Sequence, residues 1–165
     1  MTLSWLEMTE CESVFDTSAL VKIFHNEEGS ERTRELILNA QNNLYILDIA
    51  QIEYYSAIFR RYRNHELSKK SLNIAISGFE KEMSHYCIEP TTPLVIKEAQ
   101  KLIFSYGDKF GLRTLDSLHL AAFSLISNDD WIFICCDSIL SCVAEKSQFT
   151  VLNPIQQENI GFNHE

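Results

Sequence analysis

The sequence is poor in the residues that mark unstructured or fibrous chains, with only five Gly and three Pro among 165 residues. Together with 45% hydrophobic and 22% charged residues, this excludes a disordered, collagen-like or linker-dominated protein. A chain of this length can bury roughly two-thirds of its unfolded surface. The composition therefore predicts one compact globular domain of ordinary size.

The cysteine pattern fits neither a disulfide framework nor a zinc site. There are five cysteines, an odd number, and no two of them form a Cys-x-x-Cys pair. We therefore expect reduced and mostly buried thiols at Cys11, Cys87, Cys135, Cys136 and Cys142. No apolar run approaches the ~20 residues that span a bilayer, and no basic flank precedes an apolar run near residue 1. These absences predict a cytoplasmic protein without a membrane segment.

Basic residues are also scarce, since 14 Lys and Arg face 23 Asp and Glu for a net charge of -9. The molecule as a whole should repel a nucleic-acid backbone, so that any nucleic-acid role must depend on a local site. Five of the 14 basic residues nevertheless fall within 11 positions, and this segment is either a solvated helix end or a contact for nucleic acid. Its members are Arg60, Arg61, Arg63, Lys69 and Lys70.

Short apolar runs alternate with longer amphipathic ones along the chain. Strands are expected at residues 14–15, 44–47, 87–88, 131–135 and 151–152, and helices at 18–25, 30–41, 49–64, 68–85, 93–106, 114–126 and 138–146. Because parallel strands need crossover connections, this alternation predicts an α/β fold with a central parallel sheet of about five short strands and helices on both faces.

The expected domain organisation is simple. We predict an N-terminal extension at residues 1–10, a single domain at 11–154 and a polar tail at 155–165. Met8 is an alternative start to Met1.

Two acidic residues come directly after expected strands. Asp16 follows the first strand and Asp137 the fourth, and each precedes a helix. An Asp at such a position is most often a helix N-cap. In open parallel sheets, however, ligands bind beyond the carboxyl ends of the strands, so a functional interpretation stays open for both residues.

Two further acids lie inside expected helices, where capping does not explain them. Glu53 lies about one turn into its helix, and Asp116 lies between Leu115 and Leu118, where an unpaired carboxylate would be costly. If these acids converged with Asp16 and Asp137, each pair at ~4 Å would repel by about 4 kcal/mol at an effective dielectric near 20. Either raised pKa values or bound Mg²⁺ or Mn²⁺ would relieve this repulsion. Such a metal site suits phosphodiester hydrolysis and would invert the local charge for RNA.

Four strings of the sequence together resemble those of PIN-domain nucleases, and among them most of all the VapC-like toxins of type II toxin-antitoxin pairs. The strings are VFDTSAL at 14–20, LDSLHLAA at 115–122, FICCD at 133–137 and VLNP at 151–154. The resemblance implies a metal-dependent endoribonuclease with an RNA substrate, a small DNA-binding antitoxin as partner and a homodimeric state. It also implies that the catalytic and metal-binding acids are Asp16, Glu53, Asp116 and Asp137.

The sequence departs from this family at the last aspartate. Cys135 stands where the family often has Thr or Ser, and Ser138 begins an uncharged stretch where basic residues frequently follow. These departures keep a second hypothesis open, namely a catalytically weakened PIN-fold protein that acts as a regulatory or partner-binding module. A phosphatase of the haloacid-dehalogenase type would need an aspartate at Ser18, and we set it aside.

Neighbouring residues have less specific roles. His119, one turn beyond Asp116, is expected to be packed and hydrogen-bonded more often than catalytic. Thr17 and Ser18 are interpreted as neighbours of metal-bound water or substrate, because no histidine base is near them in sequence. Asp48 is expected to cap the helix that carries Glu53.

Overall fold

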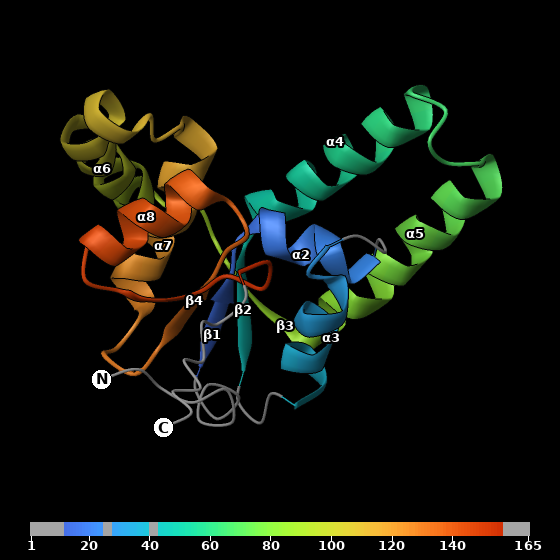
Figure 1. The fold of residues 1–165 in the computed structure, drawn as a ribbon, viewed down its shortest axis with the longest axis horizontal. Helices are drawn as coiled ribbons and strands as arrows, with labels where there is room; N and C mark the ends of the chain where they lie inside the picture. The colour runs from blue at the N-terminus through green and yellow to red at the C-terminus, as the bar shows by residue number, and fades with distance from the viewer. Residues whose placement is uncertain (1–11, 25–27, 40–42, 157–165) are drawn as a thin grey trace, which may run out of the picture.

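The structure, a computed structural model, describes residues 12–24, 28–39 and 43–156, and the predicted N-terminal extension lies outside them (Figure 1). Its centre is a five-stranded sheet in the order β3-β2-β1-β4-β5, in which every pair of neighbours is parallel. The α/β fold and the parallel sheet are therefore as predicted. The strands are β1 (Ser13–Phe15), β2 (Leu44–Leu47), β3 (Tyr86–Glu89), β4 (Ile132–Ile134) and β5 (Thr150–Leu152).

All seven predicted helical segments are helical, with differences at their ends. The segment expected at 68–85 ends as an α-helix at Glu82 and continues as a 3-10 turn, Met83–His85. The segment expected to end at 106 extends to Phe110, where Gly111 ends it in the left-handed conformation (φ 71°). The helices are α2 (Thr17–Phe24), α3 (Ser30–Asn39), α4 (Ile49–Arg63), α5 (Lys69–Glu82), α6 (Pro93–Phe110), α7 (Thr114–Ile126) and α8 (Ser138–Lys146).

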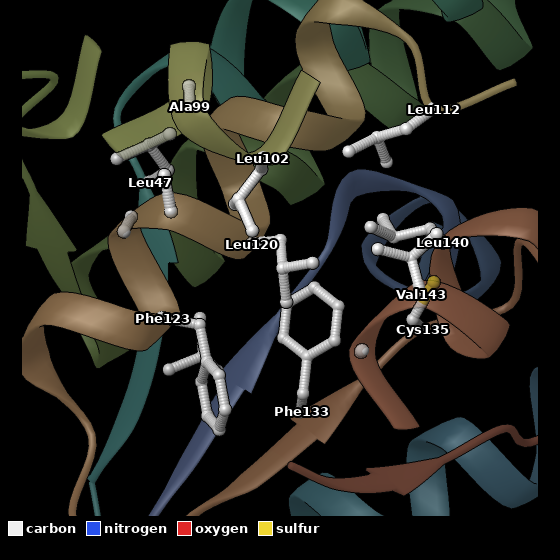
Figure 2. Packing of buried hydrophobic residues seen from close by; sticks show 14 of the residues in the cluster. Leu47, Ala99, Leu102, Leu112, Leu120, Phe123, Phe133, Cys135, Leu140 and Val143 are labelled. Carbon is white, nitrogen blue, oxygen red and sulfur yellow. The ribbon is translucent and has the colours of Figure 1, made fainter. Parts of the chain in front are cut away.

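Alternation along the strands builds a separate hydrophobic core on each face of the sheet. Val14 and Phe133 belong to the core formed with α6, α7 and α8. Figure 2 shows Phe133 in this core with Leu120 and Leu140. Phe15 and Ile134 point the opposite way, into a core shared with α2, α3, α4 and α5. Figure 1 shows the corresponding layers, with α6 to α8 on one side of the sheet and α2, α3 and α5 on the other. Both faces are covered, which is why the central strands are mostly apolar.

The strand order creates a switch point beside the central strand. From β1 the chain leads to β2 on one side, while β4 lies on the other side. The backbone N–H of Asp16 donates to the Ile134 carbonyl over 2.9 Å, so the carboxyl ends of β1 and β4 lie next to each other. This is the position at which open α/β sheets bind ligands.

Four of the five cysteines fall in the part of the chain that the structure describes, and all four are free thiols. Cys135 alone among them is fully buried, while Cys87, Cys136 and Cys142 are half-buried. The expectation of mostly buried thiols is therefore wrong for these three, because Cys87 lies on edge strand β3, Cys136 follows β4 and Cys142 lies on α8. Cys11 lies outside the described residues.

The start of the predicted polar tail is attached to the domain. The Arg32 guanidinium on α3 donates to the Gln156 carbonyl over 2.8 Å, and the Ile155 N–H donates to the Asn153 side chain over 3.0 Å. Residues 157–165 lie outside the described part. Across the ranges described, no helix combines the length and apolarity needed to cross a membrane.

Candidate active site

All four predicted acids line a single cavity of about 630 Å³. Asp16 comes from the end of β1, Glu53 from the second turn of α4, Asp116 from the first turn of α7, and Asp137 from the turn between β4 and α8. The remaining lining residues are Thr17, Ser18, Val21, Ile49, Ile52, Ser56, Ala57, Arg60, Arg113 and Leu115.

One face of α4 forms a wall of this cavity. Its lining residues recur every three or four positions, as they do on one side of an α-helix. The opposite side of α4 is buried through Ala50, Tyr54 and Ile58, and the Tyr54 ring stacks on Phe79 with centroids 3.8 Å apart. Burial of that side fixes the rotation of the helix, so that Glu53 and Arg60 both face the cavity.

Asp16 and Asp137 act as helix caps, as their positions predicted. Asp16 Oδ2 accepts the Ser18 N–H over 2.9 Å, and Asp137 Oδ1 accepts the N–H groups of Ile139 and Leu140, each over 2.9 Å. In each carboxylate the second oxygen has a different neighbour. Asp16 Oδ1 lies 3.8 Å from His119 Nε2, and Asp137 Oδ2 contacts Arg113. Capping and a role in the site are therefore compatible, because they use different oxygens of one group.

Glu53 is held by two hydrogen bonds to the same oxygen. Thr17 Oγ1 donates to Glu53 Oε2 over 2.5 Å, and His119 Nε2 lies 2.6 Å from it. Burial raises the pKa of Glu53, but the bonds from His119 and Thr17 outweigh it and hold the pKa below its usual value. Burial lowers the pKa of His119, whereas Glu53, Asp16 and Asp116 raise it and prevail. His119 is thus packed and hydrogen-bonded, as expected, and it also contacts the site.

Arg113 joins the other two acids and was not identified from the sequence. Its Nε donates to Asp116 Oδ2 and its Nη2 to Asp137 Oδ2, each over 2.9 Å. Burial keeps the pKa of Asp116 above its usual value, although Arg113 lowers it, and the neighbouring charges of Asp137 and Asp16 raise it further. The signal that could have found Arg113 is its place three residues before Asp116, on the same side of the helix start.

The donor set of the cavity suits a hard divalent cation. Carboxylate oxygens are the ligands that Mg²⁺ and Mn²⁺ prefer, and Asp116 Oδ1 and Glu53 Oε1 accept no hydrogen bond from the described residues. Within the same part of the chain, however, no three His, Cys, Asp or Glu side chains surround one point as metal ligands do. Arg113 supplies counter-charge instead, and so does His119 when it is protonated. The sequence pattern did not indicate this third solution to the repulsion.

The amino-acid sequence of residues 13–148 matches the PIN domain family. The chain belongs to this family. The predicted resemblance is thereby confirmed over most of the domain, while the outer boundaries at residues 11 and 154 stay predictions. No curated protein matches the sequence.

Solved structures with the same fold are distant in sequence. The structure of FitAcB from Neisseria gonorrhoeae is 17% identical with a TM-score of 0.67, covering 88% of this chain and 99% of that one. A toxin-antitoxin complex from Klebsiella pneumoniae is 14% identical with a TM-score of 0.60, covering 88% and 99%. VapBC2 from Rickettsia felis, bound to a DNA fragment from its promoter, is 14% identical with a TM-score of 0.58, covering 86% and 98%. At this level of identity the likeness concerns the fold.

Cys135 connects the two strand-end acids of this PIN domain. Its Sγ lies 3.8 Å from Asp16 Oδ2 and 3.5 Å from the Asp137 carbonyl oxygen, and the single S–H proton can be donated to either. Burial, together with the charge of Asp16, raises the pKa of the Cys135 thiol well above its usual value. Ser18 Oγ accepts the Cys136 N–H over 2.9 Å, so this hydroxyl also bridges the ends of β1 and β4.

The fold places only part of the basic segment (Arg60, Arg61, Arg63, Lys69 and Lys70) in the cavity. Arg60 lines the cavity of the PIN domain, whereas Arg61 and Arg63 do not. Arg61 pairs with Glu66 over 3.2 Å, and Arg63 is exposed in the last turn of α4. Lys69 Nζ lies 5.6 Å from the centre of the Tyr62 ring. Of the three arginines, the structure therefore brings Arg60 to the acids.

Asp48 does not cap α4 with its side chain, which corrects the expectation from sequence. Its carboxylate accepts hydrogen bonds from the backbone N–H and the hydroxyl of Thr91. Asp48 has an α-helical backbone conformation, and its carboxylate ties the end of β2 to the loop before α6.

Proposed function

We propose that this PIN domain is a metal-dependent endoribonuclease that hydrolyses RNA phosphodiester bonds, as the toxin component of a toxin-antitoxin system. The observation that carries the proposal is the cavity at the sheet switch point, lined by Asp16, Glu53, Asp116 and Asp137. PIN domains are generally nucleases, and four carboxylates in one cavity have the chemistry that Mg²⁺-dependent phosphodiester hydrolysis requires.

In this proposal Asp16 and Asp116 hold the principal cation, Mg²⁺ or Mn²⁺, and Glu53 and Asp137 complete the site. A divalent ion bound there would lower the pKa of a coordinated water and stabilise charge on the departing oxygen. Glu53 stays ionised because its pKa is lowered, so its Oε1 can accept a hydrogen bond from the attacking water. His119 and Thr17 orient that carboxylate through Oε2.

RNA binding by a chain of net charge -9 needs a local source of attraction. Arg60 provides a cation inside the cavity, on the same face of α4 as Glu53. In our proposal Arg60 contacts the phosphate next to the reacting bond. Arg61 and Arg63, further along the helix, contact the RNA beyond it.

The toxin part of the proposal is supported by the kind of assembly in which the same fold occurs. Structures similar to this chain include a toxin-antitoxin complex and VapBC2 bound to promoter DNA. We therefore propose a small DNA-binding antitoxin as the partner, a homodimer as the active state and the cytoplasm as the location.

RNA cleavage by the purified full chain tests the proposal. We expect cleavage of single-stranded RNA that requires Mg²⁺ or Mn²⁺, and its loss in Asp16→Asn and Asp116→Asn. Burial raises the pKa of Asp116 in the folded protein, so metal-free Asp116→Asn should unfold at the same or a higher temperature than the wild type. Exposed Asp129, in a turn before β4, provides the matched control Asp129→Asn, which should cleave normally. Cleavage that survives both active-site substitutions would contradict the proposal.

The weakened, partner-binding PIN protein is the second candidate. It is favoured by one observation, the pairing of Arg113 with Asp116 and Asp137, which occupies oxygens that a metal would need. A protein that binds its partner tightly but cleaves no RNA with either metal would support this alternative.

A further inference from the structure

We propose that Arg113 is the resident counter-cation of the acidic cavity, and that a divalent ion competes with its guanidinium for the Oδ2 atoms of Asp116 and Asp137. This inference rests on the proposed function, since it concerns how the same site becomes loaded. According to this inference, Arg113 lowers the affinity of the cavity for a divalent metal ion.

The pairing joins one guanidinium to acids from two separate elements. Nε contacts Asp116 Oδ2 in the first turn of α7, and Nη2 contacts Asp137 Oδ2 at the start of α8. Asp137 Oδ1 already accepts two backbone N–H groups, which leaves Oδ2, the oxygen bonded to Arg113, for a metal ion. At Asp116 the guanidinium bonds Oδ2, and its positive charge also repels a cation that approaches Oδ1. Arg113 and a metal ion therefore compete for these two carboxylates.

The Arg113 side chain can move more freely than the two carboxylates that it contacts. Asp137 is fixed through Oδ1, which accepts two backbone N–H groups of α8, and Asp116 is carried by a helix with a buried apolar face. The Arg113 side chain is 65% exposed, against 16% for Asp116 and 25% for Asp137. The guanidinium can thus leave by side-chain rotation into solvent, while the acids stay where they are.

The backbone keeps Arg113 beside the site in either state. Leu112 is buried in the core, and the Arg113 carbonyl accepts the Ser117 N–H over 2.9 Å at the start of α7. Gly111, with φ 71°, turns the chain between the end of α6 and this anchor. The guanidinium consequently remains within reach of the acids and returns when the metal leaves.

An exposed arginine-carboxylate contact is individually weak, so a divalent ion with two or more carboxylate ligands can displace it. The same contact still costs the ion part of its affinity, because the pairing is lost on binding. Removal of the guanidinium should therefore strengthen metal binding, whereas an arginine that merely supports the acids would weaken metal binding when removed.

Mn²⁺ titration of the full chain, followed by electron paramagnetic resonance, tests this inference without reference to catalysis. We expect Arg113→Gln to bind Mn²⁺ roughly tenfold more tightly than the wild type, because the two charge-assisted contacts with Asp116 and Asp137 together no longer compete. Without metal, Arg113→Gln should unfold at a lower temperature than the wild type, and Mn²⁺ should raise its unfolding temperature by more. Equal or weaker Mn²⁺ binding by Arg113→Gln would overturn the inference.

Arg60→Gln is the matched control, because Arg60 lines the same cavity and its side chain pairs with no acid in the described ranges. A similar gain in Mn²⁺ affinity in Arg60→Gln would indicate general electrostatics and overturn the inference. Arg113→Lys keeps the positive charge but cannot bond both carboxylates as the guanidinium does. The Mn²⁺ affinity of Arg113→Lys should therefore lie between those of the wild type and Arg113→Gln. If Arg113→Gln does not fold, Arg113→Lys decides, and binding no tighter than in the wild type overturns the inference.

The outcomes separate this inference from the proposed function. Equal Mn²⁺ binding by the wild type and Arg113→Gln, with RNA cleavage intact, contradicts the role of Arg113 alone. Absence of Mn²⁺ binding in both proteins contradicts the metal site, and with it both proposals.

Discussion

Glu53 and His119 are 66 residues apart in the sequence and meet in the cavity with 2.6 Å between Oε2 and Nε2. The imidazole is fully buried, and its other nitrogen, Nδ1, has no hydrogen-bond partner among the residues described. Its polar contacts are therefore directed at Thr17 and at the carboxylates, chiefly Glu53. Because Glu53 lies on α4 and His119 on α7, this contact fixes the orientation of the two helices relative to each other.

This pair predicts a specific pH dependence of stability for the metal-free protein. The folded pKa of His119 is raised above 6.5, so its stabilisation is fully present below pH 6.5 and lost as pH rises through the folded value. The folded pKa of Glu53 is lowered below 4.5, so its stabilisation is present above pH 4.5 and lost as pH falls through the folded value. The pair should therefore stabilise most between pH 4.5 and 6.5.

Urea unfolding in EDTA across pH 4 to 9 measures this effect. His119→Leu should lose about 1.5–3 kcal/mol near pH 5.5, the usual contribution of a hydrogen bond to a charged group, in addition to any change in packing. The loss should shrink as the pH rises, because the wild type then loses the same interaction. His85→Gln is the control, since His85 is exposed and does not line the cavity. A constant difference between wild type and His119→Leu at every pH would show that the pair is not ionic.

Arg60 should contribute more to RNA binding than Arg63, although both are exposed arginines of the same helix. Arg60 lines the acidic cavity and Arg63 does not. If RNA is cleaved in this cavity as proposed, Arg60 alone of the two would reach the phosphate next to the reacting bond. Arg60→Gln should weaken binding of single-stranded RNA and reduce the slope of log K against log salt by about 0.7. Arg63→Gln should change the slope less. The measurement is fluorescence anisotropy at several salt concentrations with Ca²⁺ in place of Mg²⁺, and an unaltered slope in Arg60→Gln would remove this residue from the interface.

Cys135 should resist alkylation in the folded protein. Its thiol is buried and its pKa is raised, so the reactive thiolate is scarce, whereas the neighbouring Cys136 is half-buried. We expect N-ethylmaleimide to modify Cys135 at least about a hundredfold more slowly than Cys136, and at a comparable rate after unfolding in urea. Mass spectrometry of the peptides measures both rates in one sample. Comparable rates in the folded protein would show that the ends of β1 and β4 separate readily.

Much of the fold could be predicted from local patterns. The short apolar runs around Val14 and Phe133 indicated strands, and the amphipathic spacing around Ile58 indicated a helix, because burial on known faces dictates these periods. Element ends were harder to predict, because the groups that satisfy the end of a helix or strand can come from residues distant in the sequence. The side chain of Asp48 illustrates this, because Thr91 lies 43 residues away and outcompetes the local cap.

For the cavity, the sequence by itself determined which acids follow strands or begin helices, and hence that Asp16, Glu53, Asp116 and Asp137 were candidates to meet. Only the tertiary structure decided what neutralises them. Arg113 reaches Asp137 across 24 positions and His119 reaches Glu53 across 66, so no local pattern relates these charges. Repulsion between acids is a property of distances in space, and those distances exist only once the parallel strands have brought the carboxyl ends of β1 and β4 together.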